Sequence, residues 1–322
     1  MKKGDVDIPQ HKPGNMAENS MGGTELLTME LFKRLPEEYK NYFQFVISRV
    51  NKEDLEDKPR LYWLHDLALD PVHDFLREPE GLNLFDKLIF VSHWQQQSFQ
   101  NFLRIPYSKG VVIKNAIDPI EYHEKPKDGP LQLMYCSTPQ RGLDVLLTAL
   151  DMLDRDDYHL HVYSSYKLYG WVQNDEPYKP LFEKIEEHPN MTNYGAVPYD
   201  VLREAWKKMH ILAYPSTWQE TSCRVAMEAM SAHCAIVTSN WGALPETCGE
   251  YAYMYNFTEN KTDHAEYFAD ELEDVMEEYW SETTQFNLDN ARQYAYTHYS
   301  WSKRISQWTN FLANLKYEIE NG

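Results

Sequence analysis

Short apolar runs alternate with amphipathic segments along most of the chain. Runs rich in β-branched and aromatic residues have the length of buried strands. In the first part of the chain these runs lie at 42–50, 60–66, 87–93 and 110–117. Helical spacing marks 94–103 and also 24–35, where Leu27, Leu31 and Leu35 recur every four residues. Strands that alternate with helices predict a parallel sheet covered by helices on both faces.

The alternation restarts after a polar segment. Residues 123–130 contain two prolines and a glycine, which predicts a linker between domains. The strands predicted beyond it lie at 131–137, 158–165, 191–197, 210–216 and 234–240. The helices predicted beyond it lie at 142–153, 199–209, 222–233 and in the charged tail from about 263 onward. The pattern therefore predicts two α/β domains, each of a size that holds one ordinary core.

The pattern also predicts where these domains end. We expect a short amino-terminal Rossmann-like domain at 1–125, a second Rossmann-like domain at 130–298, and a carboxy-terminal helix at 299–322 that crosses back to the first domain. The helix has a predicted buried face formed by Trp301, Ile305, Trp308 and Leu312. Parallel sheets of this class bind ligands at the carboxyl ends of their strands, so we expect the site in a cleft between the two domains.

Charge and cysteine usage narrow the class of protein. The formal net charge of −19 repels a phosphate-covered partner, so we expect no nucleic acid and no broad contact with an anionic membrane. The four cysteines lack metal-site spacing and are expected to be free thiols in a reducing cytoplasm. No apolar run follows the first lysines and no 18-residue apolar stretch exists, so we expect neither a signal peptide nor a transmembrane helix.

Candidate chemistry is concentrated at 215–230, PSTWQETSCRVAMEAM. Glu228 falls inside an apolar helix, where a carboxylate is costly unless it has something specific to hold. Glu220 lies on the loop that follows a buried strand, and Thr221 or Ser222 is expected to cap the helix. The start of this helix can bind an anion. A carboxylate that accepts two hydroxyl hydrogen bonds suits a ribose diol.

The order of these motifs resembles glycosyltransferase family 4. That family shows E-x7-E followed by a segment similar to EAMSAHCAIVTSNWGALPE, although the family's proline is Ala235 here. Further segments at 21–25, 113–119, 140–150 and 193–206 resemble other motifs of the family in the same order. The resemblance implies the GT-B fold, which has two Rossmann-like domains with parallel sheets facing across a cleft.

The resemblance also implies roles for individual residues. Glu228 is expected to hold the ribose hydroxyls, and Glu220 to lie near the hydroxyls of the donor sugar. Arg141 is expected to bind the diphosphate bidentately. The family usually has a second cation, but this chain has Cys136 and Ser137 there, and Lys114 is a candidate substitute. His65 matches a histidine near the anomeric carbon.

Backbone contacts are implied as well. Gly22 and Gly23 are expected to let the backbone approach the diphosphate or the acceptor. The backbone of Thr221, Ser222 and Cys223 is expected to face the sugar and the diphosphate. The turn expected to contact the base consists of Tyr194, Gly195 and Ala196.

The implied activity is retaining sugar transfer without a metal or another cofactor. The donor is a nucleoside-diphosphate sugar, with UDP favoured over GDP by family frequency, and the acceptor is a hydroxyl of a glycan or another molecule. A nucleotide-sugar epimerase and a non-catalytic nucleotide- or sugar-binding protein stay open as alternatives. An oxidoreductase that uses a dinucleotide is less favoured, because no G-x-G-x-x-G follows a predicted strand.

Two acidic segments resemble metal motifs only superficially. The stretch HDLALDPVHD at 65–74 has no standard metal spacing and is expected to be a solvated helix start. The stretch DRDD at 154–157 follows an amphipathic helix and is expected to be a polar loop. We therefore expect no metal site.

Overall fold

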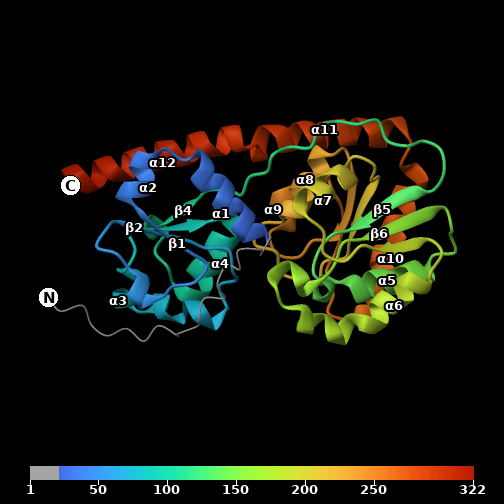
Figure 1. The fold of residues 1–322 in the computed structure, drawn as a ribbon, viewed down its shortest axis with the longest axis horizontal. Helices are drawn as coiled ribbons and strands as arrows, with labels where there is room; N and C mark the ends of the chain where they lie inside the picture. The colour runs from blue at the N-terminus through green and yellow to red at the C-terminus, as the bar shows by residue number, and fades with distance from the viewer. Residues whose placement is uncertain (1–21) are drawn as a thin grey trace. The chain divides into compact units, whose positions relative to one another are not determined.

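The computed structural model describes residues 22–322, which form two compact units. Unit 1 contains Gly23–Ala116 and Trp301–Gly322. Unit 2 contains Ile117–Ser300 and Gly22. Each unit has its own parallel sheet with helices packed on it (Figure 1), so the predicted α/β class with two parallel sheets is confirmed.

The sheet of unit 1 has the order β1-β2-β3-β4, and all its pairs are parallel. Its strands are β1 Gln44–Ile47, β2 Arg60–Trp63, β3 Lys87–Phe90 and β4 Gly110–Val112. Each predicted strand of this part is present but shorter than the apolar run that marked it. Leu64 and Ile113 remain fully buried just beyond their strands, because apolar burial continues where ladder pairing has ended.

The helices of unit 1 come from both ends of the chain. They are α1 Gly23–Arg34, α2 Glu37–Tyr42, α3 Pro79–Leu82, α4 His93–Leu103, α12 Trp301–Asn321 and the short 3-10 helices η1 Lys52–Asp54, η2 Pro71–Arg77 and η3 Tyr107–Lys109. Ser92 caps α4, since its side chain accepts a hydrogen bond from the Gln95 amide at 3.0 Å. Trp301, Trp308 and Leu312 of α12 are buried in one apolar cluster with residues of α1, β2 and β3.

The sheet of unit 2 has the order β10-β9-β8-β5-β6-β7 and is also entirely parallel. Its strands are β5 Leu131–Tyr135, β6 Tyr158–Val162, β7 Met191–Asn193, β8 Ile211–Tyr214, β9 Ala235–Ser239 and β10 Tyr253–Tyr255. The five predicted strands are present, and β10 is an addition. It is three residues long and pairs only with β9 at the edge of the sheet, so it left no clear periodic signal.

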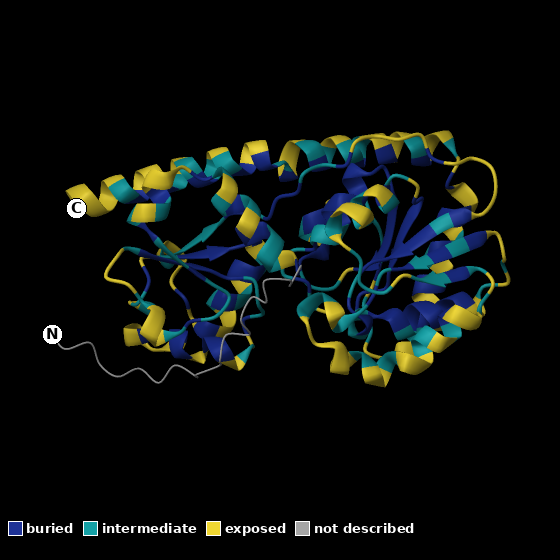
Figure 2. Cartoon of the chain, in the orientation of Figure 1, coloured by how far each residue is buried: buried dark blue, intermediate teal, exposed yellow. Residues whose placement is uncertain are grey.

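The helices of unit 2 cover both faces of this sheet. They are α5 Leu143–Met152, α6 Lys179–Glu187, α7 Tyr199–Trp206, α8 Arg224–Ser231, α9 Leu244–Cys248, α10 Lys261–Glu278, α11 Glu282–Tyr299 and the 3-10 helices η4 Pro139–Arg141, η5 Tyr166–Tyr169 and η6 Val172–Tyr178. Helices α5 and α10 pack together on one face, and α8 packs with α11 on the other. Figure 2 shows the strands buried and the outer helix faces exposed, as amphipathic helices on a parallel sheet require.

The segment between β4 and β5 contains no helix or strand. This segment nevertheless packs against unit 2. The side chain of Lys125 is buried, and its Nζ donates a hydrogen bond to the Trp206 carbonyl at 3.0 Å. The division between the units falls at Ala116 and Ile117, so this part of the chain belongs to unit 2.

The strand order of unit 2 changes direction between two adjacent strands. From β5 the chain continues through α5 to β6 on one side, and from β8 it continues through α8 to β9 on the other. The adjacent strands β5 and β8 thus form a topological switch point, and their carboxyl ends are where such sheets bind ligands.

Candidate functional site

The loop that follows β8 lies at this switch point and is held from two sides. On one side, the Thr217 amide donates to the Arg141 carbonyl at 3.3 Å, and Thr217 Oγ1 donates to the Gln140 carbonyl at 3.1 Å. On the other side, Ser239 Oγ donates to the Ser216 carbonyl at 2.7 Å. The loop after β8 is therefore fixed between the loop after β5 and the end of β9.

Two glycines permit this close approach. Gly142 has a φ of +115°, and a Cβ there would lie 2.1 Å from the Pro215 carbonyl oxygen. Gly242 has a φ of +68°, and a Cβ there would lie 2.6 Å from the Glu220 carbonyl oxygen. That same carbonyl accepts a 2.7 Å hydrogen bond from the Ala243 amide. Glycine is required at both positions for steric and conformational reasons.

Glu220 lies at the centre of the first polar cluster. Its carboxylate Oε1 accepts hydrogen bonds from Arg141 Nη1 and from the Tyr214 hydroxyl, both at 2.7 Å. The Arg141 guanidinium also lies over the Trp218 ring, with Cζ 5.3 Å from the ring centroid. Glu220 is 6% exposed, so its charge is balanced inside the protein by a guanidinium and a hydroxyl.

Glu228 lies at the centre of the second polar cluster. Its Oε1 accepts a 2.7 Å hydrogen bond from the Tyr199 hydroxyl and lies 3.0 Å from Arg224 Nη2. The Arg224 guanidinium stacks on Tyr199, with Cζ 4.5 Å from the ring centroid. Glu228 is only 2% exposed, which answers why an apolar helix carries it: a cation and a hydroxyl satisfy the buried charge.

The two clusters repeat one arrangement of arginine, glutamate and tyrosine. In each, both contacts reach Oε1 of the glutamate, and Oε2 has no hydrogen bond or ion pair within residues 22–322. The Nε atoms of Arg141 and Arg224 are buried and also have no hydrogen-bond partner in that part of the chain. Carboxylate oxygens accept from hydroxyls and guanidinium N–H groups donate to anions, so the clusters can bind a ligand that carries both.

Electrostatics keep both arginines charged. Burial by itself would lower the pKa of Arg141, but Glu220 and Tyr214 raise this pKa well above its usual value. Burial and Glu228 oppose each other in the same way at Arg224, whose pKa is also raised. Each guanidinium is therefore a permanent cation beside its glutamate.

The start of α8 corrects one expectation. The helix begins at Arg224, so its N-cap residue is Cys223, and neither Thr221 nor Ser222 caps it. Cys223 itself makes no side-chain cap hydrogen bond within the described chain. Arg224 is therefore the first residue of an eight-residue helix whose start lacks a side-chain cap from Cys223.

The turn expected to contact a base follows β7. Tyr194 is 42% exposed and stacks on Tyr163, with ring centroids 4.6 Å apart and an interplanar angle of 8°. Gly195 has a φ of +62°, and its amide donates to Asn193 Oδ1 at 3.0 Å. Ala196 is half-buried beside them. This turn presents an aromatic side chain and a fixed backbone.

The remaining predicted residues lie at three other places. Ser137 is half-buried two residues after β5, on the loop that carries Arg141. Gly22 is buried directly before α1, and Gly23 is the first residue of α1, where an added Cβ would meet no atom of the described chain within 4 Å. His65 follows β2 in unit 1 with its ring 4.6 Å from that of Trp63, and burial lowers its pKa to about 3, which keeps the imidazole neutral.

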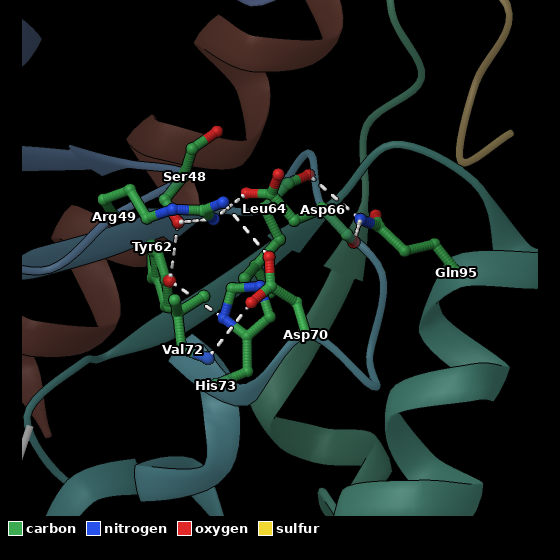
Figure 3. A network of polar contacts seen from close by, with 9 residues as sticks. All are labelled: Ser48, Arg49, Tyr62, Leu64, Asp66, Asp70, Val72, His73 and Gln95. Atoms are coloured by element: carbon green, nitrogen blue, oxygen red, sulfur yellow. Dashed lines mark hydrogen bonds and ion pairs between the residues drawn. The ribbon is translucent and has the colours of Figure 1, made fainter. Parts of the chain in front are cut away.

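The acidic stretch at 65–74 contains the expected helix start, because Asp70 caps η2 by accepting a 3.2 Å hydrogen bond from the Val72 amide, but the expectation that it is simply solvated is wrong. Figure 3 shows Arg49 reaching both Asp66 and Asp70, and the Nη2 to Asp70 distance is 3.1 Å. Tyr62 and His73 share a 3.0 Å hydrogen bond beside this ion pair. The network links β1, β2 and η2 within unit 1, so the acidic residues have a structural role.

The acidic segment at 154–157 is largely exposed. Arg155 pairs with Asp157 at 2.7 Å within the DRDD segment, which is a loop as expected. Among residues 22–322, histidine, cysteine and acidic side chains do not gather in groups of three or more that could hold a metal ion. None of the helices in the same range combines the length and apolar character needed to span a bilayer.

Comparison with known proteins identifies the family. A model of the family "Glycosyl transferases group 1" matches residues 122–294, which is more than half of the chain. The chain belongs to this family. The matched range contains the clusters around Glu220 and Glu228, and both clusters lie within unit 2 of this group 1 transferase. No curated protein sequence matches the chain significantly.

Solved structures show the same fold at low sequence identity. A glycosyltransferase from Rickettsia africae ESF-5 is 16% identical, with a TM-score of 0.69 over 95% of this chain and 85% of its own. Sucrose-phosphate synthase from Thermosynechococcus elongatus is 15% identical, with a TM-score of 0.69 over 92% and 79%. Anabaena HepE in complex with UDP-glucose is 18% identical, with a TM-score of 0.64 over 80% and 72%. The predicted GT-B fold is thereby confirmed.

Three residues of the clusters were absent from the sequence-based prediction: Tyr199, Tyr214 and Arg224. Arg224 had a usable signal, because it precedes Glu228 by four residues on one helix and can therefore reach it. Tyr199 lies 29 residues from Glu228 and on another helix, so no local pattern connects the two. Tyr214 resembled an ordinary apolar residue of a buried strand.

Proposed function

We propose that this group 1 transferase is a retaining glycosyltransferase of family 4. It transfers a sugar from a nucleoside-diphosphate sugar, UDP in preference to GDP, to a hydroxyl of a glycan or another acceptor. It requires no metal ion or other cofactor. The observation that carries the proposal is the pair of clusters around Glu220 and Glu228 near the switch point of β5 and β8. HepE, which shares the fold, binds UDP-glucose, and this supports the choice of donor.

The nucleotide half of the donor fits the second cluster. Glu228 Oε2 has no partner within the described chain and would accept hydrogen bonds from the ribose hydroxyls. The turn of Tyr194, Gly195 and Ala196 would contact the base through its backbone and aromatic ring. The buried position of Glu228 shields these hydrogen bonds from water, which strengthens them.

The diphosphate and sugar fit the first cluster. Arg141 would bind the diphosphate, and Glu220 would accept hydrogen bonds from the hydroxyls of the donor sugar. The backbone of Thr221, Ser222 and Cys223 would face both groups at the uncapped start of α8. Ser137 would stand beside the diphosphate as a neutral residue.

Three further residues, from the first part of the described chain, have proposed roles in the same reaction. His65, neutral because of its lowered pKa, would lie near the anomeric carbon as a hydrogen-bonding group. Gly22 and Gly23 would let the backbone at the start of α1 approach the diphosphate or the acceptor.

The chemistry needs no side-chain nucleophile. The bond from the anomeric carbon to the diphosphate oxygen breaks, and the leaving oxygen takes the bonding electron pair. The acceptor oxygen forms a bond to the anomeric carbon on the same face, and its proton passes to the departing phosphate. Arg141 and the start of α8 stabilise the negative charge that develops on the leaving group.

The experiment is an assay of the purified protein with UDP-glucose, UDP-N-acetylglucosamine and GDP-mannose, with EDTA present. Release of UDP and formation of a glycoside with the donor's anomeric configuration, determined by NMR, is the expected result. Isomerised donor without transfer would instead identify an epimerase. Nucleotide binding without turnover for any acceptor tested would identify a binding protein.

A further inference from the structure

Arg224 is the first residue of α8, and two contacts fix its guanidinium. Nη2 lies 3.0 Å from Glu228 Oε1, and Cζ lies 4.5 Å from the centroid of the Tyr199 ring. The side chain is 14% exposed, so it is largely but not completely buried. A buried cation held this firmly is preorganised, because the entropy of ordering the long side chain is lost before any ligand arrives.

The hydrogen bonding of Arg224 is incomplete. Its Nε is buried and has no partner within residues 22–322, and its one ion pair uses Nη2. A buried polar donor without a partner is destabilising, and more so when it is charged. The Nε atoms of Arg141, Arg292 and Arg304 are also buried without a hydrogen-bond partner, and of these only Arg141 lies in one of the two clusters. The guanidiniums of both clusters thus have donor capacity that the described protein does not use.

The loop after β5 lies near the same guanidinium. Burial raises the pKa of the Cys136 thiol, Glu228 raises it further, and Arg224 lowers it. Cys136 is therefore within electrostatic reach of both members of the second cluster. Ser137 follows directly, and Arg141 closes η4 on the same loop. Arg224 is therefore within electrostatic reach of the start of the loop whose end carries Arg141.

We infer that Arg224 is the second cation for the donor diphosphate and takes the place that Ser137 leaves without a charge. The inference rests on the proposed function. Arg224 would donate to a phosphate oxygen while Tyr199 and Glu228 hold the guanidinium in position. Phosphate at this point also lies at the uncapped start of α8, where the backbone N–H groups and the helix dipole favour negative charge.

A diphosphate needs directed hydrogen-bond donors here more than net positive charge. Glu220 offsets the charge of Arg141, Glu228 likewise offsets that of Arg224, and the whole chain has a formal net charge of −19. One guanidinium that is already paired gives a diphosphate little net attraction in such a field. A second fixed guanidinium supplies further directed N–H donors, and these bind phosphate oxygens more strongly than neutral donors do.

The test compares UDP with uridine by isothermal titration calorimetry for the wild type and for Arg224→Gln. Loss of a phosphate contact is expected to weaken UDP binding roughly 10- to 100-fold. Uridine has no phosphate, so its affinity is expected to fall much less than that of UDP, and the difference between the two losses reports the phosphate contact. An equal loss for both ligands would mean that Arg224 only supports Glu228, and it would overturn the inference.

A second pair of variants removes the unpaired carboxylate that Arg224→Gln leaves behind. In Glu228→Gln and in the double variant Arg224→Gln/Glu228→Gln, the buried charge of residue 228 is absent. The double variant is expected to bind UDP roughly 10- to 100-fold more weakly than Glu228→Gln alone. Equal UDP affinity of these two variants would contradict a direct phosphate contact.

The calorimetry also distinguishes an error in the proposed function from an error in the role of Arg224. If the wild type binds neither UDP nor uridine, the nucleotide-binding function itself is overturned, and the inference falls with it. If the wild type binds UDP and Arg224→Gln binds it equally well, only the role of Arg224 is overturned.

Discussion

At the scale of single residues, the most informative position is Glu228. A carboxylate inside an apolar helix would be destabilising if it had no partner, and here Arg224 and Tyr199 supply a cation and a hydroxyl. Replacing such a group with a hydrophobic residue is often neutral for stability in other proteins. The stability of the fold therefore does not explain why this cluster is present, whereas a role in ligand binding does.

The first prediction concerns the carboxylate of Glu228. Glu228→Gln keeps the shape of the side chain but weakens its hydrogen bonds to a ribose diol. We expect UDP affinity, measured by calorimetry, to fall roughly 10- to several-hundredfold, which corresponds to about 1.5–3 kcal/mol. Tyr199→Phe is the matched control. It removes one neutral hydrogen bond and is expected to weaken UDP binding by only about 1 kcal/mol. A folded Glu228→Gln protein with unchanged affinity would refute the assignment.

At the scale of elements, the loop after β8 depends on its neighbours more than on its own sequence. It is held by backbone hydrogen bonds to the loop after β5 and by a pairing of Glu220 with Gly242. Each of these contacts requires a glycine that lets two backbones approach closely. The position of Glu220 therefore depends on residues that never touch a ligand.

The second prediction tests this dependence. Gly142→Ala places a Cβ against the Pro215 carbonyl at a φ of +115°, whereas Gly170→Ala introduces a Cβ at a φ of +74° with no atom within 4 Å. Both variants have the cost of a left-handed backbone, about 1–2 kcal/mol. We expect Gly142→Ala to lower the free energy of unfolding of unit 2, measured in urea, by a further ~1–3 kcal/mol. We also expect it to weaken UDP binding. Similar unfolding midpoints for Gly142→Ala and Gly170→Ala would show that the close approach of residue 142 to the Pro215 carbonyl does not matter for stability.

The third prediction concerns the network that links β1, β2 and η2. Burial and, to a smaller extent, Arg49 lower the pKa of His73 to about 4 against the opposing effect of Asp70 and Asp74, whereas the unfolded value is about 6.5. The unfolded chain therefore binds more protons between these two values, and stability falls as the pH decreases through that window. The full loss, reached below about pH 4, is on the order of 3 kcal/mol.

Urea unfolding at pH 7 and pH 5 measures this effect. The wild type is expected to lose about 2 kcal/mol more than His73→Gln between these values, because glutamine does not titrate. His123→Gln is the control, since His123 is exposed and its replacement is expected to leave the pH dependence unchanged. If the wild type and His73→Gln lose the same free energy of unfolding between pH 7 and pH 5, His73 is excluded as the source of the pH dependence.

At the scale of the whole molecule, the last helix belongs with the first part of the chain. Helix α12 follows unit 2 in sequence, but its apolar face is buried in the core of unit 1. Trp308 is 1% exposed and packs edge-on against Trp63, with ring centroids 5.3 Å apart. Unit 1 is therefore complete only when both ends of the chain are present.

The fourth prediction follows from this closure. Trp308→Ala should lower the free energy of unfolding of unit 1 by about 3–5 kcal/mol, because it empties a large buried volume. Tyr317→Ala on the same helix is the control, since Tyr317 is 69% exposed and should change stability by less than about 0.5 kcal/mol. Urea unfolding followed by near-ultraviolet circular dichroism measures both. A wild-type midpoint for Trp308→Ala would mean that α12 does not stabilise unit 1.

The sequence by itself determined the order and type of most elements. Apolar periodicity and turn residues are local properties, so β1 to β9 and the longer helices could be predicted from short windows. The spacing of Glu220 and Glu228 and the neighbouring motifs also led to the GT-B fold and to Arg141. These features depend on residues close together in the chain.

Only the tertiary structure decided which side chains meet. The partners of the two glutamates come from α7, β8, η4 and α8, and the edge strand β10 is defined by its pairing with β9. The acidic stretch at 65–74 was misjudged because Arg49, which neutralises it, lies on an earlier segment. Contacts between distant segments depend on strand order and packing, and no local pattern of hydrophobic and polar residues encodes them.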